Sequence, residues 1–221
     1  MRYHACITRS IIIIYFICTA SAGIAQFKAG SVNWTKDGTG LYEIQDNMLL
    51  RINPLSAQQV TVLATATQLT PREKDKPLTI ADFEISPDEN ILLIFTNTAR
   101  VWRYNTRGDY WILNRGTGQL KQIGKDKPSQ SLMYAKLSPD GKKVGYVSNH
   151  NIYTEDIDSG NTIALTTNGN RQLINGTFDW VYEEELGCRD GFRWSGDSKN
   201  IAYWQVDATG TRDYLMLNTT D

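Results

Sequence analysis

The chain has 221 residues, of which 21% are charged, and its formal net charge is −1 at pH 7. This length can bury a sizeable core, either as one large domain or as two ordinary ones. The near-neutral balance, without a stripe or tail of lysine and arginine, excludes a protein that binds nucleic acid through a basic surface.

The first 25 residues have the pattern of a secretory signal. Arg2 and Arg9 precede an apolar run at residues 11–18, and small residues follow it as far as Ala25. Because the run is too short to cross a bilayer comfortably, we expect cleavage after Ala25, with Ala22 as the alternative. An uncleaved N-terminal anchor is the other interpretation.

Residues 26–221 are predicted to be the exported protein, periplasmic or secreted, without membrane contact once the signal peptide over residues 1–25 is removed. Only Cys188 then remains of the three cysteines, so no internal disulfide can form. A nucleophilic cysteine needs a histidine and an orienting partner, and the surrounding sequence supplies neither. We expect Cys188 to be a small hydrophobic side chain, buried or half-buried.

A turn-like cassette occurs three times, at intervals of about 50 residues. It reads Ser-Pro-Asp at residues 86–88 and 138–140, and Ser-Gly-Asp at residues 195–197. Alternating apolar residues precede each copy, as in a strand with one buried face, and a continuous apolar run follows it. Each cassette is therefore predicted to be the turn of a β-hairpin.

Further short strands follow each predicted hairpin. The third strands are expected at residues 109–114, 151–156 and 213–218, and the fourth at residues 119–123 and 162–165. Four short antiparallel strands per period predict the blades of a β-propeller in an all-β protein. A weaker copy at residues 32–53 brings the expectation to about four blade units.

The predicted ring of blades is incomplete in this chain. A propeller must close its ring, and the last unit stops at Asp221 directly after its third strand. We therefore expect further blades in a longer parent protein. No long amphipathic helix is predicted, and residues 67–79, with two prolines and five consecutive charges, are expected to form a solvated loop.

The residues for most catalytic chemistries are missing from the exported sequence. A serine triad needs a histidine, but His4 leaves with the signal and His150 lies on a predicted turn, and no G-x-S-x-G elbow occurs. With one cysteine, one histidine and no phosphate loop, we expect neither a metal nor a cofactor. We therefore predict no catalytic residue in this chain.

Two features are suited to recognition instead. Residues 178–186 contain the run Glu183, Glu184 and Glu185, and adjacent carboxylates repel one another unless a cation lies between them. The alternative is a solvated charged surface on a loop or short helix. The second feature is Arg103, which could donate paired hydrogen bonds to a carbonyl or carboxylate, or could be a structural cation stacked on a neighbouring aromatic ring.

These residues resemble a known family. The string DWVYEEE at residues 179–185, followed by Trp194 and Ser195, resembles the double-Glu motif of the dipeptidyl peptidase IV family of serine exopeptidases. Trp102 and Arg103 are similar to the segment with that family's substrate-facing arginine, and the similarity extends over most of the exported chain. Residues 187–193 look more like bacterial members, which leaves substrate preference open.

The resemblance implies an eight-bladed propeller that caps a C-terminal α/β-hydrolase domain, which this chain lacks. It implies that Glu184 and Glu185 bind the free α-ammonium of a peptide, that Arg103 binds the carbonyl of the N-terminal residue, and that Glu183 is the outward member of the run. Such an enzyme would release N-terminal dipeptides, commonly after proline or alanine, and the full-length protein could form a homodimer.

Two functional hypotheses follow. In the first, the chain is the N-terminal, substrate-anchoring part of an exported dipeptidyl-peptidase-IV-like serine peptidase, and it is inactive alone because the missing hydrolase domain supplies the triad. In the second, it is part of a non-catalytic periplasmic propeller that serves as a binding or assembly scaffold, since a fold does not imply a function.

Overall fold

The computed structural model describes residues 33–213, 215 and 217. The chain divides into Met1–Asn33 and Trp34–Asp221, and the fold reported below is that of the second unit. The predicted signal peptide lies outside the described residues and stays a prediction. Within the described part, no helix is both long enough and apolar enough to cross a membrane.

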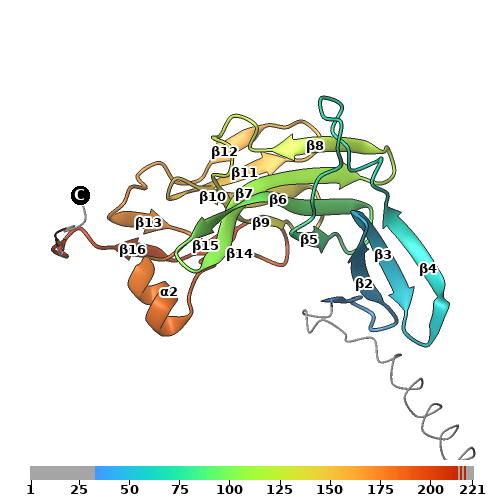
Figure 1. Cartoon of the computed structure of the whole chain (residues 1–221). Helices are drawn as coiled ribbons and strands as arrows, with labels where there is room; N and C mark the ends of the chain where they lie inside the picture. Colours follow the sequence, from blue (N-terminus) through green and yellow to red (C-terminus); the bar gives the residue numbers. More distant parts are fainter. Residues whose placement is uncertain (1–32, 214, 216, 218–221) are drawn as a thin grey trace, which may run out of the picture. The chain divides into compact units, whose positions relative to one another are not determined.

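The first blade is a four-stranded sheet with the order β1-β2-β3-β4 (Figure 1). Its strands are β1 (Asn33–Trp34), β2 (Leu41–Gln45), β3 (Met48–Asn53) and β4 (Ser56–Ala64). Strands β2, β3 and β4 pair in antiparallel fashion. The predicted early copy of the repeat is therefore a blade.

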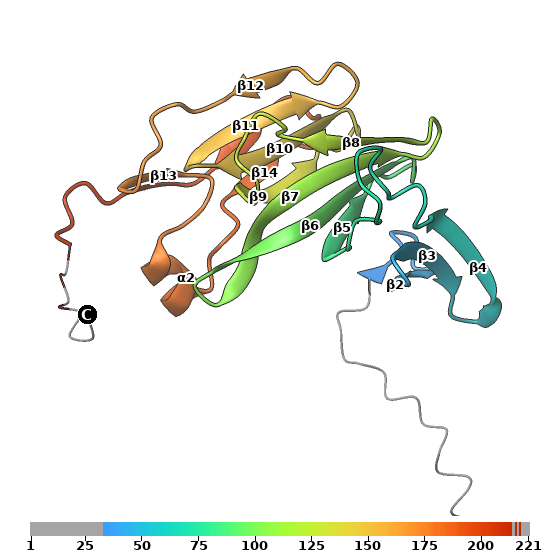
Figure 2. The ribbon, with the colours of Figure 1, turned by 45° about the horizontal axis from the view of Figure 1, so that its top comes forward.

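The next two blades share one eight-stranded sheet. The second blade contains β5 (Asp82–Ile85), β6 (Ile91–Val101), β7 (Tyr104–Asn114) and β8 (Gln119–Ile123). The third contains β9 (Leu132–Leu137), β10 (Lys143–Ser148), β11 (Asn151–Asp156) and β12 (Thr162–Ala164). The two blades join where Arg107 and Gly108 of β7 pair with Met133 and Leu132 of β9 (Figure 2).

The last part of the chain forms two small sheets and the one helix among the described residues. Strand β13 (Leu173–Asn175) pairs with β16 (Gln205–Asp207), β14 (Phe192–Trp194) pairs with β15 (Ile201–Tyr203), and α2 covers Trp180–Leu186. The apolar run at 201–204, predicted as one strand, ends at Tyr203, and β16 then pairs with a different partner. Much of the strand predicted at residues 213–218 lies outside the described residues.

The three predicted hairpin turns are confirmed, and their side chains explain the repeat. In the third blade the Ser138 hydroxyl donates to the Asp140 carboxylate over 2.6 Å and accepts a bond from the amide of Lys143 over 2.9 Å. The other two cassettes make the same pair of bonds. In the first blade the Thr35 hydroxyl likewise donates to the Asp37 carboxylate and accepts from the amide of Gly40. The repeated unit is therefore a serine or threonine two positions before an aspartate.

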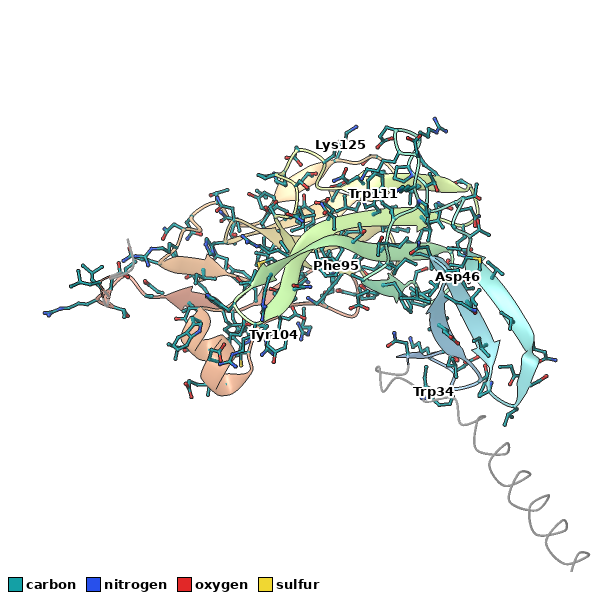
Figure 3. The ribbon with its side chains drawn as sticks, in the orientation of Figure 1. Trp34, Asp46, Phe95, Tyr104, Trp111 and Lys125 are labelled. Atoms are coloured by element: carbon teal, nitrogen blue, oxygen red, sulfur yellow. The ribbon has the colours of Figure 1, made fainter. Side chains whose placement is uncertain are left out.

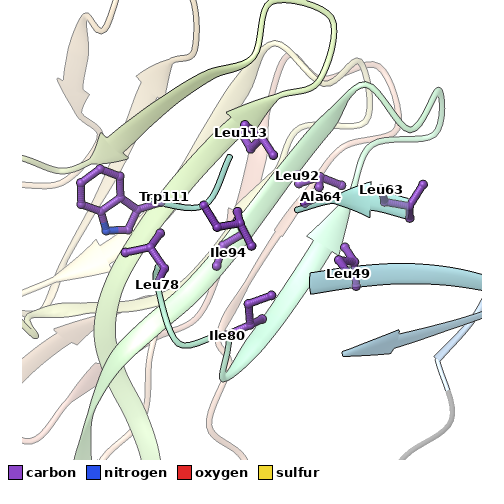
Figure 4. Close-up of a cluster of buried hydrophobic side chains, with 10 residues drawn as sticks. Leu49, Leu63, Ala64, Leu78, Ile80, Leu92, Ile94, Trp111 and Leu113 are labelled. Carbon is purple, nitrogen blue, oxygen red and sulfur yellow. The ribbon is translucent and has the colours of Figure 1, made fainter. Parts of the chain in front are cut away.

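The two central strands of the second blade are buried on both faces at residues 92–94 of β6 and 110–113 of β7, and these stretches are continuously apolar. Figure 4 shows one core cluster, in which Leu92 and Ile94 of β6 and Trp111 of β7 pack with Leu49 and Leu63 of the first blade. The alternate residues, Leu93, Tyr110 and Ile112, belong to a second cluster with side chains of the third blade.

The loop at residues 67–79 is only partly solvated, which corrects the prediction. Its charged residues 72–76 are exposed, but Leu69 and Leu78 are buried in the first core cluster. Burying a leucine side chain contributes roughly 1.5–3 kcal/mol to the free energy of folding. The two buried leucines therefore attach this loop to the blade.

Candidate functional site

The run of glutamates lies on α2, a helix of seven residues with a capping group at each end. The Asp179 side chain accepts a hydrogen bond from the amide of Tyr182 over 3.0 Å. Gly187 ends the helix in the left-handed conformation at φ 66°, and its N–H bonds the Tyr182 carbonyl. The aspartate before the run and the glycine after it therefore determine where this short helix begins and ends.

The helix places its three glutamates in different environments. Successive residues are rotated by about 100° around a helix, so neighbours face different directions. The side chain of Glu183 is 5% exposed and that of Glu184 is 13% exposed, while Glu185 is exposed. The expectation that Glu183 is the outward member of the run is wrong, because this is the buried one.

Arg103 and Glu184 lie 81 positions apart in sequence and form an ion pair of 2.6 Å between Nε and Oε1. The hydrogen bond from Arg103 to this carboxylate raises the pKa of the guanidinium. Arg103 is 69% exposed and does not take part in the cation–π contacts found among the described residues. The alternative of a structural cation stacked on Trp102 or Tyr104 is therefore not what the structure has.

The arginine reaches the helix because β6 and β7 extend as a long hairpin. Each strand has 11 residues, and the register shifts twice, between Thr96 and Ala99 and between Ala99 and Val101. Trp102 turns the chain at φ 49°, and its carbonyl accepts a bond from Arg100. Figure 3 shows Tyr104 at this end of the hairpin, beside α2.

Arg189 is a site residue that the sequence reasoning missed. Its Nε lies 3.3 Å from the Oε1 of Glu183, and its guanidinium lies 4.0 Å from the centre of the Tyr104 ring. The two paired atoms are buried without a well-aligned hydrogen bond, so their contact is an ion pair of imperfect geometry. The only sequence signal was that residues 187–193 look more like the bacterial members of the family that the chain resembles.

The three glutamates of α2 and the two arginines that contact them together carry one uncompensated negative charge. Arg103 pairs with Glu184 and Arg189 pairs with Glu183, whereas Glu185 forms none of the ion pairs found among the described residues. Three carboxylates against two guanidinium groups suit a single monovalent cation. No group of side chains that could hold a metal ion is present in the described part of the chain.

His150 and Cys188 lie where the sequence analysis expected them. His150 forms the turn between β10 and β11 together with Asn149, with φ of 62° and 47°. Burial lowers the pKa of His150. Cys188 has intermediate exposure, as predicted for a half-buried side chain.

Comparison with known proteins identifies the family. The family model described as the dipeptidyl peptidase IV N-terminal region matches residues 86–221. The chain belongs to the dipeptidyl peptidase IV family. This dipeptidyl peptidase IV-like chain is 29% identical over 210 residues to dipeptidyl peptidase 4 of Arthroderma otae, a match that covers 93% of the chain and 25% of that protein.

Other known proteins match over a similar share of their own length. Human prolyl endopeptidase FAP is 28% identical over 189 residues, covering 85% of this chain and 24% of its own length. The crystal structure of Porphyromonas gingivalis dipeptidyl peptidase 4 superposes with a TM-score of 0.73 at 26% identity, over 83% of this chain and 26% of that one. The predicted propeller fold is thus confirmed, and the chain spans about a quarter of the length of these three proteins.

Proposed function

We propose that this chain is the N-terminal, substrate-anchoring part of an exported dipeptidyl-peptidase-IV-like serine peptidase. In this proposal Glu184 and Glu185 bind the α-ammonium of a peptide and Arg103 binds the carbonyl of its first residue. The ion pair between Arg103 and Glu184 carries the proposal, because it brings together the two halves of the predicted clamp from distant parts of the chain.

The charge of the site supports an ammonium ligand. Two carboxylates that lack a full counter-charge gain one when a primary ammonium enters, and charge-assisted hydrogen bonds are about twice as strong as neutral ones. Arg189 compensates Glu183, so Glu184 and Glu185 are the carboxylates left to share Arg103 and a ligand. The clamp therefore suits a peptide with a free N-terminus better than one with a blocked N-terminus.

Arg103 can serve the carboxylate and the substrate at once. A guanidinium has five N–H donors, and among the described residues only Nε of Arg103 is bonded. Its exposed terminal nitrogens can donate to a peptide carbonyl while Nε stays on Glu184. Fixing both the ammonium and the first carbonyl would set how far the peptide extends into the enzyme, which is the basis for releasing dipeptides.

Cleavage itself would come from a hydrolase domain in the longer protein, which supplies the serine, aspartate and histidine. We propose that the 221-residue chain alone does not turn over a Gly-Pro substrate. The scaffold hypothesis makes a different prediction, since a longer gene product without such a triad would bind peptides and never cleave them.

The clamp is tested in the full-length protein by Glu184→Gln and Glu185→Gln, which remove one charge each and keep the shape. We expect each to lower kcat/KM for a Gly-Pro chromogenic substrate by about 10- to 100-fold, as for loss of a hydrogen bond to a charged group. Glu73→Gln, in the exposed part of residues 72–76, is the control. Activity near that of the control in both variants would contradict the clamp and support the alternative that the glutamate run is a solvated charged surface.

A further inference from the structure

A pocket of about 590 Å³ adjoins the proposed clamp. It is lined by Trp102, which precedes Arg103, and by Glu183, which precedes Glu184, and Arg189 lines it as well. The remaining walls come from β6 and β7, from residues 127–131 and β9, from β10, β11 and the turn between them, and from the segment before α2. A peptide held at the clamp would therefore have this pocket next to it.

The pocket has an excess of positive charge. Arg107, Lys127 and Arg189 line it, against the single carboxylate of Glu183. Arg189 already pairs with that carboxylate, and Lys127 bonds Asp126 over 2.7 Å. Arg107 takes part in none of the ion pairs formed among the described residues, so its charge remains available to a ligand.

Neutral hydrogen-bonding groups line the same pocket. The hydroxyls of Ser131 and Ser148 lie 3.2 Å apart on its wall. Burial lowers the pKa of His150, so its imidazole is neutral at pH 7 and the charge of the pocket comes from arginine and lysine. These groups could donate to a carboxylate held by Arg107.

The backbone of β9 is irregular at this pocket. Two of its residues, Tyr134 and Ala135, stand opposite the single residue Tyr146 of β10, and Tyr134 has a φ of 52°. Bulges redirect side chains, and left-handed non-glycine residues persist only where the surroundings hold them. Tyr134 lines the pocket at this bulge, which is consistent with a wall shaped for a ligand.

We propose that this cationic pocket is a subsite for an acidic side chain of the bound peptide. The protein would then favour peptides that carry aspartate or glutamate within reach of their anchored N-terminus. This rests on the proposed function, because the clamp brings the peptide to the pocket. The clamp with its spare negative charge and the pocket with its spare positive charge would bind opposite ends of one short segment.

The test uses the full-length protein and matched peptides with proline at the second position. Glutamate and glutamine are exchanged in turn at the first, third, fourth and fifth positions, and the ratio of kcat/KM for the two members of each pair is measured. We expect a ratio of about 5 in favour of glutamate at one position, as for one modest ion pair. The ratio should fall as salt is added.

Arg107→Gln is the decisive variant, because this exposed arginine can be replaced without breaking an ion pair of the described structure. We expect the ratio to fall towards 1, whereas Arg72→Gln, which removes an exposed charge from residues 72–76, should leave it unchanged. An unchanged ratio in Arg107→Gln overturns the proposal. So does a ratio of 1 at every position in the unmodified protein, which is the result expected if an acidic group of the longer chain fills the pocket.

The clamp variants separate this proposal from the proposed function. Glu184→Gln should lower kcat/KM equally for both peptides of a pair and leave their ratio unchanged. If the clamp variants have no effect while Arg107→Gln abolishes the preference, the ammonium clamp is wrong and the acidic subsite stands.

Discussion

Asp140 illustrates how single residues organise the propeller. Its carboxylate accepts a bond from the Ser138 hydroxyl, which closes the hairpin by accepting from the amide of Lys143. The bond from Ser138 lowers the pKa of Asp140. In the first blade the bond from Thr35 lowers the pKa of Asp37 to about 2. The repeated turn therefore favours the ionised form of its aspartate.

Asp140→Asn should destabilise the protein at pH 7 and have little effect in acid. A lowered pKa in the folded state means that the ionised form favours folding, so this stability is present above the unfolded pKa and is lost as the pH falls through the folded value. For this exposed group we expect a loss of at most about 1 kcal/mol at pH 7 that disappears only as the pH falls below the lowered pKa of Asp140. Thermal unfolding at pH 7 and at about pH 2 measures it.

The control for Asp140→Asn is Asp75→Asn, at an exposed aspartate that makes none of the side-chain bonds found in the described structure. This control should leave the melting temperature unchanged at both pH values. A destabilisation by Asp140→Asn that is as large at about pH 2 as at pH 7 would contradict the titration argument.

At the scale of elements, α2 positions the candidate site although it is too short to be stable alone. Its direction depends on Asp179 and Gly187 at its ends and on the ion pairs that attach it to the tip of the β6–β7 hairpin. Arg103 and Tyr104 are adjacent on the hairpin, and each contacts a charged group of the helix segment. The helix and the hairpin tip thus form one unit.

Gly187→Ala should destabilise this unit without a steric clash. A methyl group at Gly187 would meet no atom within 4 Å, so the cost is that of the left-handed backbone, about 1–2 kcal/mol. For a protein of this size we expect a fall in melting temperature of roughly 2–8 °C. Gly187→Asn should cost less, because asparagine tolerates this conformation.

Gly196→Ala is the matched control for the helix cap. A methyl group at Gly196 also meets no atom within 4 Å, but Gly196 has no left-handed φ. It should leave the melting temperature nearly unchanged. Equal effects of the two alanine substitutions would show that the cap does not limit stability.

At the scale of the whole molecule, half-buried charges join distant parts of the chain. Lys136 of β9 pairs with Asp190, which follows α2, and its ammonium lies 3.8 Å from the centre of the Phe192 ring of β14. Burial lowers the pKa of Lys136, and the hydrogen bond to Asp190 opposes that shift. This link therefore attaches the segment behind the candidate site to the third blade.

Asp190→Asn should cost more stability than Lys136→Met. The first leaves a half-buried ammonium without its counter-charge, at a cost of about 1–2 kcal/mol, less than for a fully buried pair. The second leaves Asp190 paired with Arg193 and places an apolar side chain against Phe192. Urea unfolding of the full-length protein compares them, with the surface variant Lys199→Met as reference, and the reverse order would contradict this account.

The propeller and its hairpins could be predicted from the sequence because their signals are local. Alternating apolar residues determine which face of a strand is buried, and the serine and aspartate of each turn bond within five residues of one another. The resemblance of residues 179–185 to a family motif was equally local, and the match to residues 86–221 confirmed the family.

Only the tertiary structure decided which charges meet. Arg103 and Glu184 pair across 81 positions, Glu183 is buried against Arg189, and the leucines of the loop at residues 67–79 enter the core. Such contacts depend on how the long β6–β7 hairpin reaches the short helix, and on how blades pack face to face. Local patterns specify the blades, but the packing between blades determines which distant side chains become neighbours.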